Sequence, residues 1–455
     1  MELRTVTYRW AKLAMIAALL PAPVCAQQTA ERPDAHQAQP AAVEHQREQQ
    51  PAAAQPDSAE SEQPRDRIVD PTKFPPKSPL PARILLAPFR ALAPKMERGI
   101  TYVENTQVLT RAREFLRDPH ARPLIGGQGD GSGFGGGVAL STADSLPGLQ
   151  FFGTVRATTK KYTEMIAGIR SGTQSEKVEK FYVKLIGIHR LRPQEDFWGI
   201  GAGTPATQRT NYDLQERGAD LSLNLRPQSL LKFGVGLNYS SSSVFPGEDQ
   251  RFPTTQSQFS PLQVPGLAEG AALLSSYFFA EFDSRKGASN PVHAGFIRLG
   301  ISSNDSVGRG DFGYWNYNLD TRYYAPMGSE HRVLAVRMLL EFNAPKGGSQ
   351  VPFFRLARLG DRETLRGYDT YRFHARNAAA WNVEYRVDLT GGIGAFGFTD
   401  FGQVFDDWSE FGSRFFRITY GGGLQFKSRK KIFLRVYLGK SEEGSRFFFT
   451  FGPTF

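Results

Sequence analysis

The sequence predicts a sixteen-stranded antiparallel transmembrane β-barrel with an inward-folded plug loop, preceded by a short helical segment. From about residue 120 to the C-terminus, apolar and polar residues alternate with a period of two, which is typical of strands. The polar positions are often charged, and short turns alternate with longer loops. These observations favour a barrel with lipid outside and a wet lumen over a soluble sandwich.

Residues 1–26 have the parts of a secretory signal peptide. A basic stretch, MELRTVTYRWAK, precedes the apolar run LAMIAALLPAPV, which is too short for a membrane span, and VCA follows before Gln27. A lipoprotein signal at Cys25 is the alternative, although Ala22 and Val24 fit a lipobox poorly. Cleavage after Ala26 would leave a mature chain without cysteine, and therefore without disulfides.

Two different segments are predicted before the barrel. Residues 27–80 are rich in Gln, Pro and Ala, which predicts a disordered periplasmic linker. Residues 81–120 predict a helical pre-barrel segment that packs on the next domain or, less often, lies on a membrane surface. Its apolar residues recur at helical spacing at Val108, Leu109, Ala112 and Leu116. After the signal peptide no apolar run is long enough for a transmembrane helix.

Residues 121–455 are predicted to form the outer-membrane barrel, with the first strand near 121–128. Fifteen strands can be counted, and an even number is the rule for such barrels, which gives sixteen. The alternation is clear in WNVEYRVDL at 381–389, YWNYNLDTRYY at 314–324 and IFLRVYL at 432–438. In the last of these, Arg435 is predicted to oppose a face made of Ile432, Leu434, Val436 and Leu438.

The connections are of two kinds. Short turns are predicted at 226–229, 326–330, 390–392 and 427–430, and long loops at about 191–210, 240–268 and 343–375. Short turns on one side and long loops on the other are typical of outer-membrane barrels.

The last long loop contains ETLRGYDTYRF at 363–373, which fits neither a strand nor a helix. On the two strands that follow it, alternation points Glu384 and Asp400 into the lumen. Arg366 is therefore the natural partner for these two carboxylates if the loop folds into the barrel. Gly367 would let the backbone turn where a Cβ would clash.

These residues carry a resemblance to a known family. LRGY, at Leu365, Arg366, Gly367 and Tyr368, resembles the loop motif of the bacterial surface-antigen family, the outer-membrane barrel-assembly superfamily. FTDFG, with Phe398, Asp400 and Gly402, resembles the paired strand motif of that family, and RPQEDFWGIG at 192–201 resembles its segment after a middle strand. The resemblance covers about 120–455.

The resemblance implies a bacterial outer-membrane barrel in which the loop arginine docks against lumen acids, Glu384 and Asp400. It also implies insertion or translocation of unfolded outer-membrane or secreted polypeptides through a seam between the first and last strands. The alternative is a passive pore or structural anchor without such clients. Residues 27–120 lack the strand and helix pattern of the family's periplasmic POTRA modules, so a barrel-only member is expected, with a tail available to a periplasmic accessory protein.

The C-terminal stretch FFFTFGPTF places Phe447, Phe449, Phe451 and Phe455 on one predicted face. In the family the terminal phenylalanine belongs to a recognition signal for barrel assembly, so the resemblance implies the same role here. A hydrophobic last strand is the plainer alternative.

Both lips of the predicted seam contain residues that pair poorly. Pro453 cannot donate a backbone hydrogen bond, and GSGFGGGVAL at 131–140 contains Gly135, Gly136 and Gly137, which weaken strand pairing. Alternatively, Pro453 only ends its strand and the glycines ease the curvature of the barrel.

The charge of the chain suits a lipid surface. The formal net charge is +10 and the pI is about 9.5, which in an exported protein fits anionic lipid headgroups or lipopolysaccharide rather than nucleic acid. A solvated basic surface is equally compatible.

We expect neither an enzyme nor a cofactor. DFG at 400–402 has no kinase catalytic loop beside it, and GGQGDGSGFGGG at 126–137 lacks the Lys-Ser/Thr of a phosphate-binding loop. The seven histidines show no metal-ligand spacing. The sequence therefore predicts no catalytic residues and no metal site.

Overall fold

The computed structural model describes residues 121–125, 132–141, 148–171, 180–285, 288, 290–390, 392–412, 415–427 and 432–451. All of them belong to one compact unit, Arg65–Phe455. The predicted signal peptide, linker and pre-barrel helix lie outside the described residues, as do Pro453 and Phe455. Within the described part of the chain, no helix combines the length and apolar character needed to cross a membrane.

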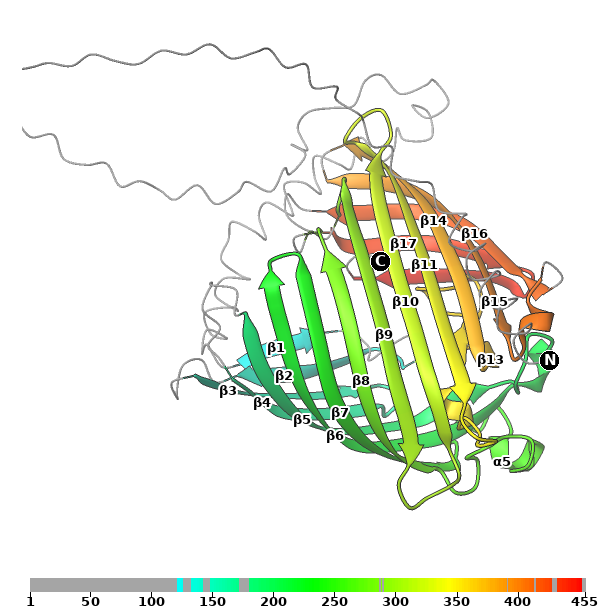
Figure 1. Ribbon diagram of the computed structural model, residues 1–455. Helices are drawn as coiled ribbons and strands as arrows, with labels where there is room; N and C mark the ends of the chain where they lie inside the picture. The colour runs from blue at the N-terminus through cyan, green and yellow to red at the C-terminus, as the bar shows by residue number, and fades with distance from the viewer. Residues whose placement is uncertain are drawn as a thin grey trace, which may run out of the picture. The chain divides into compact units, whose positions relative to one another are not determined.

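The wall of the barrel is one sheet of sixteen strands. Figure 1 shows how this sheet curves around the lumen. Its strands follow one another in chain order, and neighbouring strands are antiparallel. The predicted fold is confirmed, and the first strand lies inside the range expected for it. The strands are β1 (Ala121–Ile125), β2 (Gly135–Ser141), β3 (Leu149–Thr158), β4 (Thr163–Ser171), β5 (Phe181–Phe197), β6 (Thr210–Gln228), β7 (Leu231–Pro246), β8 (Ala271–Asp283), β9 (Ala294–Ser306), β10 (Gly313–Pro326), β11 (Arg332–Pro345), β14 (Asn377–Thr390), β15 (Ile393–Phe405), β16 (Arg417–Lys427), β17 (Ile432–Ser441) and β18 (Gly444–Thr450).

The two faces of the sheet differ in polarity because side chains alternate along each strand. On β6, Leu221, Leu223 and Leu225 point outward and are 44–47% exposed, whereas Ser222 and Asn224 between them are buried on the lumen side. The other long strands repeat this arrangement. An exposed apolar surface of this extent is unfavourable in water and suits a lipid bilayer.

The long strands run further than the sequence predicted. β5 continues across Pro193, where its register with β6 shifts between Arg192 and Glu195, and β7 continues to Pro246. The predicted loops at 191–210 and 240–268 are therefore shortened to 198–209 and 247–270. Because proline cannot donate to a ladder, its position in β5 coincides with an irregularity in the pairing.

A second register shift, between Phe426 and Lys427, changes which way the start of β17 faces. Phe433 and Leu438 are exposed, but Ile432 is buried. The prediction that Ile432 shares a face with Leu438 is wrong, because a two-residue period does not survive an irregularity in the ladder.

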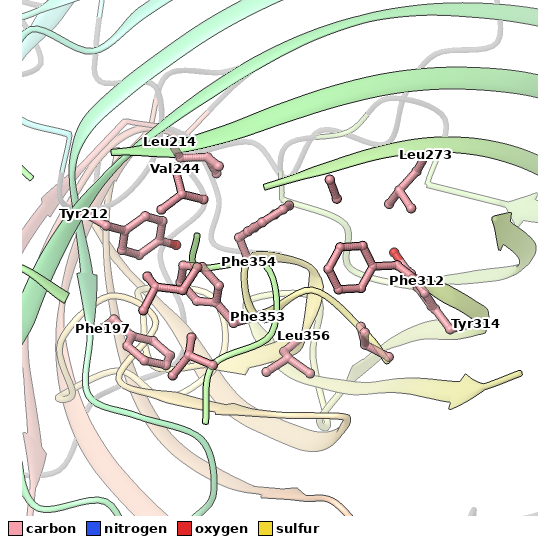
Figure 2. Packing of buried hydrophobic residues seen from close by; sticks show 14 residues of the cluster. Phe197, Tyr212, Leu214, Val244, Leu273, Phe312, Tyr314, Phe353, Phe354 and Leu356 are labelled. Carbon is pink, nitrogen blue, oxygen red and sulfur yellow. The ribbon is translucent and has the colours of Figure 1, made fainter. Parts of the chain in front are cut away.

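The long loops pack together over one end of the lumen. Phe353 begins the 3-10 helix η2 (Phe353–Arg355), and its ring centroid lies 5.1 Å from that of Phe197 and 4.8 Å from that of Tyr212. Phe354, Val264 and Phe312 join them in a buried cluster drawn from several loops and strand ends (Figure 2). The cluster therefore holds in place the first part of the loop that connects β11 to β14.

Candidate functional site

Residues 346–376, which we call the plug loop, connect β11 to β14 and lie inside the barrel. They include β12 (Ala357–Leu359) and β13 (Phe373–Ala375), which form a small antiparallel pair. Leu365 and Tyr368 are buried in a cluster with residues of this pair and with inward-facing Ala378 and Ala380 of β14. The plug loop is therefore packed against the barrel wall.

Arg366 is fully buried and binds two carboxylates from adjacent strands. Its Nη1 donates to Oε2 of Glu384 at 2.7 Å. Its Nη2 and Nε donate to the two oxygens of Asp400 at 2.6 and 2.9 Å, and its backbone N–H donates to Asp400 at 3.0 Å. The fork of the guanidinium matches the carboxylate of Asp400, which sets both the position and the orientation of the loop.

The two carboxylates have different further partners. Glu384 also accepts from Arg386 at 2.6 Å and from Arg435 at 2.5 Å. Asp400 accepts from the neutral side chains of Asn382 and Thr419, at 2.9 and 3.1 Å. Within the described part of the chain, Asp400 forms its ion pair with Arg366, whereas Glu384 forms ion pairs with three arginines.

Aromatic rings cover the guanidiniums. The Cζ atom of Arg366 lies 3.6 Å from the ring centroid of Phe398, and that of Arg435 lies 3.7 Å from the centroid of Phe396. Such stacking stabilises a cation that has left water. Phe398 therefore acts on the same arginine as Asp400, from the same face of β15.

Glycines allow the backbones of the plug loop and the wall to touch. Gly367 has a φ of +126°, and a Cβ there would lie 2.9 Å from the carbonyl carbon of Lys440. A Cβ on Gly439 of β17 would lie 2.8 Å from the carbonyl oxygen of Arg366. Gly402 of β15 faces Leu365 and Leu359, whose methyl carbons would come within 3.2 and 3.0 Å of an added Cβ.

The plug loop also binds the last hairpin of the sheet, β17–β18, in what we call the hairpin latch. Ser441 and Arg446 both donate to the carbonyl oxygen of Gly367, at 2.9 and 3.1 Å. Arg446 donates a further hydrogen bond to Asp369 at 2.7 Å, and Arg372 binds Glu443 at 2.9 Å. The loop is thereby tied to the strands at one end of the sheet.

The segment after β5 holds the other side of the plug loop. The backbone N–H of Gly201 donates to the carbonyl of His374 at 2.7 Å, and Arg372 donates to the hydroxyl and carbonyl of Thr204 at 2.9 and 2.6 Å. Burial lowers the pKa of His374 well below its ordinary value, and the nearby cations Arg358 and Arg372 lower it further. His374 is therefore held neutral in the plug.

Several site residues were not singled out from the sequence. Arg386 and Arg435 occupy inward positions of their strands. The alternation of the sequence could therefore have predicted that both side chains face the lumen. Gly439 and Arg446 gave no such signal, because their role depends on which strand the loop meets. Among the described residues, no group of three or more side chains suited to bind a metal comes together.

The predicted C-terminal signal and seam lie at the end of the sheet. Phe447 and Phe449 on the outer side of β18, and Phe451 just after it, are 57–69% exposed. Gly135, Gly136 and Gly137 lie in β2, between β1 and β3, so the prediction that they form a lip of the seam is wrong. A Cβ on Gly135 or Gly137 would lie 2.4 or 2.1 Å, respectively, from a carbonyl oxygen of β3. These glycines therefore allow β2 and β3 to approach each other closely.

The sixteen-stranded sheet with the loop of Arg366 docked inside it has the architecture of a transmembrane β-barrel with an internal plug. The Omp85 superfamily domain matches residues 195–455, and the chain belongs to that superfamily. No curated protein sequence matches it.

Solved structures with a similar fold have little sequence in common with the chain. One is BamA from Haemophilus ducreyi lacking POTRA domains 1–3, with 15% identity and a TM-score of 0.53 over 73% of this chain and 69% of that one. Another is CdiB from Escherichia coli, with 10% identity and a TM-score of 0.48 over 70% of this chain and 58% of that one. At such identities the likeness to BamA concerns the fold.

Proposed function

We propose that this protein resides in the bacterial outer membrane and assists the insertion or translocation of polypeptides through a seam between β1 and β18. The observation that carries the proposal is the shortness of the last strand of the sheet. β18 has 7 residues, whereas β6 has 19 and β7 has 16. Backbone pairing along so short a strand is easily exchanged for pairing with another chain.

The hairpin latch supports this proposal because it joins the plug loop to one edge of the seam. Displacing β18 strains the contacts of Arg446 and Ser441 with Gly367. Those contacts lie next to the buried Arg366 network, so the docked loop favours one position of the hairpin. Membership of the Omp85 superfamily agrees with a role in handling polypeptides.

A polar cavity favours the alternative, a passive pore. It has a volume of about 400 Å³ and lies on the inner side of β6–β10. Its lining includes Asp220, Asn238, Ser275, Tyr277, Arg298 and Asn318. A wet space of this kind would pass small solutes if the cluster over the lumen opened.

The partners follow from the preferred function. They are unfolded outer-membrane or secreted polypeptides, lipid and lipopolysaccharide around the barrel, and a periplasmic accessory protein that binds the N-terminal tail. The proposal requires no cofactor and no catalytic residue.

Deletion of the protein tests these alternatives. Folded barrels and secreted proteins would be quantified in outer-membrane and medium fractions, and uptake of small solutes would be measured in the same cells. Loss of particular polypeptides with unchanged solute uptake supports client handling. Unchanged polypeptide levels with altered uptake contradict it and support the pore.

A further inference from the structure

The cavity on the inner side of β6–β10 has a flat wall because one tyrosine lies along the sheet. Tyr277 of β8 reaches across Gly236 of β7, and its hydroxyl donates to Asp220 of β6, at 2.8 and 3.0 Å from the two carboxylate oxygens. A Cβ on Gly236 would lie only 2.5 Å from Cζ of Tyr277. The ring therefore occupies the space that a side chain at Gly236 would take.

Two further glycines flatten the same wall. A Cβ on Gly234 would lie 2.3 Å from the ring of Phe279, and one on Gly300 would lie 2.5 Å from Oδ1 of Asn318. Each of these glycines pairs directly with the residue whose side chain covers it. Because the covering side chains lie along the sheet, they leave open a cavity of about 400 Å³. This volume lies within the range of small-molecule sites, about 300–1,000 Å³.

Tyr277 turns one face of its ring to the cavity. The other face lies against the wall at Gly236, and the residue is half-buried in the lining of the cavity. Phe279 beside it is 8% exposed and is covered by Arg298, whose Cζ atom lies 4.4 Å from the ring centroid. Tyr277 is therefore the ring that a ligand can reach on this wall. The negative face of an aromatic ring attracts the weakly positive C–H groups of a ligand.

Uncharged polar side chains line the cavity beside this ring. Asn238, Ser275 and Asn304 form one row across β7, β8 and β9. Asn304 donates to Oγ of Ser302 at 3.0 Å, and Asn238 donates a long hydrogen bond of 3.4 Å to the carbonyl of Ala219. Within the described part of the chain, the amide oxygens of both asparagines accept no hydrogen bond. The row therefore favours a ligand that pairs with amides and hydroxyls.

The charges of the cavity favour a neutral ligand. Arg298 is paired with Glu281 at 2.7 Å, and Arg355 of the plug loop is paired with Glu216 at 3.0 Å. Asp220 forms no ion pair with the residues that the structure describes. An anionic ligand would be repelled by Asp220 and would compete with the two glutamates, whereas a cationic ligand would meet two arginines.

The cavity is closed at the end next to the hydrophobic cluster. Leu273 and Tyr314 belong both to the lining of the cavity and to the cluster shown in Figure 2. Arg355, the last residue of η2, lines the cavity from the plug loop. A solute that enters this space is therefore held between the wall and the plug loop while the cluster stays closed.

We propose that this cavity is a binding site for a neutral saccharide. A sugar ring has an apolar face of C–H groups, which packs on Tyr277, and hydroxyl groups that both donate and accept hydrogen bonds. Those hydroxyls match the amides of Asn238 and Asn304, the hydroxyl of Ser275 and the carboxylate of Asp220. The site lies on the middle strands of the sheet, so the proposal goes beyond the handling of polypeptides and does not depend on it.

Saturation-transfer nuclear magnetic resonance tests whether sugars bind. The full chain would be folded in lauryldimethylamine oxide, whose headgroup contains no sugar, and mixed with glucose, maltose, cationic glucosamine or anionic glucuronate. We expect transfer of saturation to the two neutral sugars and weaker transfer to the two charged ones. Absence of transfer to both neutral sugars, or stronger transfer to a charged sugar, would overturn the proposal.

Two variants locate the binding within the cavity, and the affinity of each for maltose would be measured by titration. Tyr277→Ala removes the stacking ring and should weaken binding about tenfold. Asn238→Ala leaves the ring in place and should also weaken binding, because a hydrogen-bonding partner of the sugar is lost. Tyr239→Ala is the matched control, since Tyr239 is 44% exposed on the outer face of β7, and it should bind like the wild type.

Only folded protein enters this comparison, and heat-modifiable mobility on gels identifies it. If Tyr277→Ala does not fold, Asn238→Ala still tests the proposal. Wild-type affinity in either folded variant, or an equal loss of affinity in Tyr239→Ala, would show that the sugar does not bind in this cavity.

Discussion

Arg366 binds two carboxylates on two strands without contact with water. Such buried ion pairs contribute little net stability relative to apolar packing, because removing charges from water is costly. Losing one partner is much more harmful, since the other is left charged and unpaired. The pair therefore specifies where the loop docks more than it adds to overall stability.

Arg366→Ala should destabilise the docked plug by about 3–5 kcal/mol. Most of this arises at Asp400, because Glu384 keeps Arg386 and Arg435. The folded band on gels should lose its heat resistance at a lower temperature, and protease should cleave the plug loop. Arg251→Ala is the control, since the Arg251 side chain is 69% exposed and its ion pair with Asp249 lies within one surface loop.

The double variant Arg366→Ala/Asp400→Asn checks the physical cause. Removing the stranded carboxylate should recover part of the lost heat resistance, because the two sites interact directly. If Arg366→Ala alone leaves heat resistance and loop protection unchanged, the docking account fails.

His374 makes the plug sensitive to acid. Its folded-state pKa is depressed, so the released loop binds a proton near pH 6.5 while the docked loop does not. The contribution of neutral His374 to the free energy of docking is complete above pH 6.5. It decreases as the pH falls below 6.5, by at most about 1.4 kcal/mol per pH unit. Protease cleavage of the plug should therefore increase between pH 7 and pH 5.

The substitution His374→Phe should remove most of this pH dependence while keeping the ring that packs 5.2 Å from Phe197. His293→Gln, at an exposed position, should retain it. An unaltered pH profile in His374→Phe would assign the effect to other groups.

At the scale of elements, the plug loop and the hairpin β17–β18 behave as one packed unit. Their backbones approach closely at Gly367 and Gly439, and the hairpin latch joins them through side chains. Packed elements shift between discrete positions rather than deforming smoothly. Displacement of the plug loop should therefore also displace β18.

Gly439→Ala should separate the two elements. The added Cβ would meet the backbone of Arg366 at 2.8 Å, and such overpacking costs about 1–3 kcal/mol. Gly397→Ala is the matched control, because its Cβ would lie 3.8 Å from the nearest neighbouring atom. We expect faster hydrogen exchange in both the plug loop and β18 for Gly439→Ala only. Faster exchange in the plug alone would show that the elements are not coupled.

Sequence patterns predicted the elements better than their contacts. Alternation placed Glu384 and Asp400 in the lumen, and the loop motif supplied Arg366 as their partner. The hairpin latch could not be predicted, because the contact between Arg446 and Asp369 depends on how deeply the loop enters. The prediction that Gly135–Gly137 line the seam failed for a related reason. Glycine weakens an edge strand, but it also permits close packing inside a sheet, and composition alone does not distinguish the two cases.

At the scale of the whole molecule, the long strands in the middle of the sheet contrast with its short last strand, β18. β5 and β6 are 17 and 19 residues long, and the loops above them are sealed by a hydrophobic cluster. Among the described residues, β18 contributes nothing to this cluster, and Phe447 and Phe449 on it and Phe451 just after it are exposed. Any opening of the wall should therefore occur between the two end strands.

Locking the seam tests this account most directly. Cysteines at Leu124 of β1 and Ser445 of β18 would be bridged by a flexible thiol crosslinker in cells that have no other copy of the protein. The account predicts that client polypeptides fall to the level of the deletion strain, whereas each single-cysteine variant treated alike keeps wild-type levels. Full client levels with a completely bridged seam would contradict it.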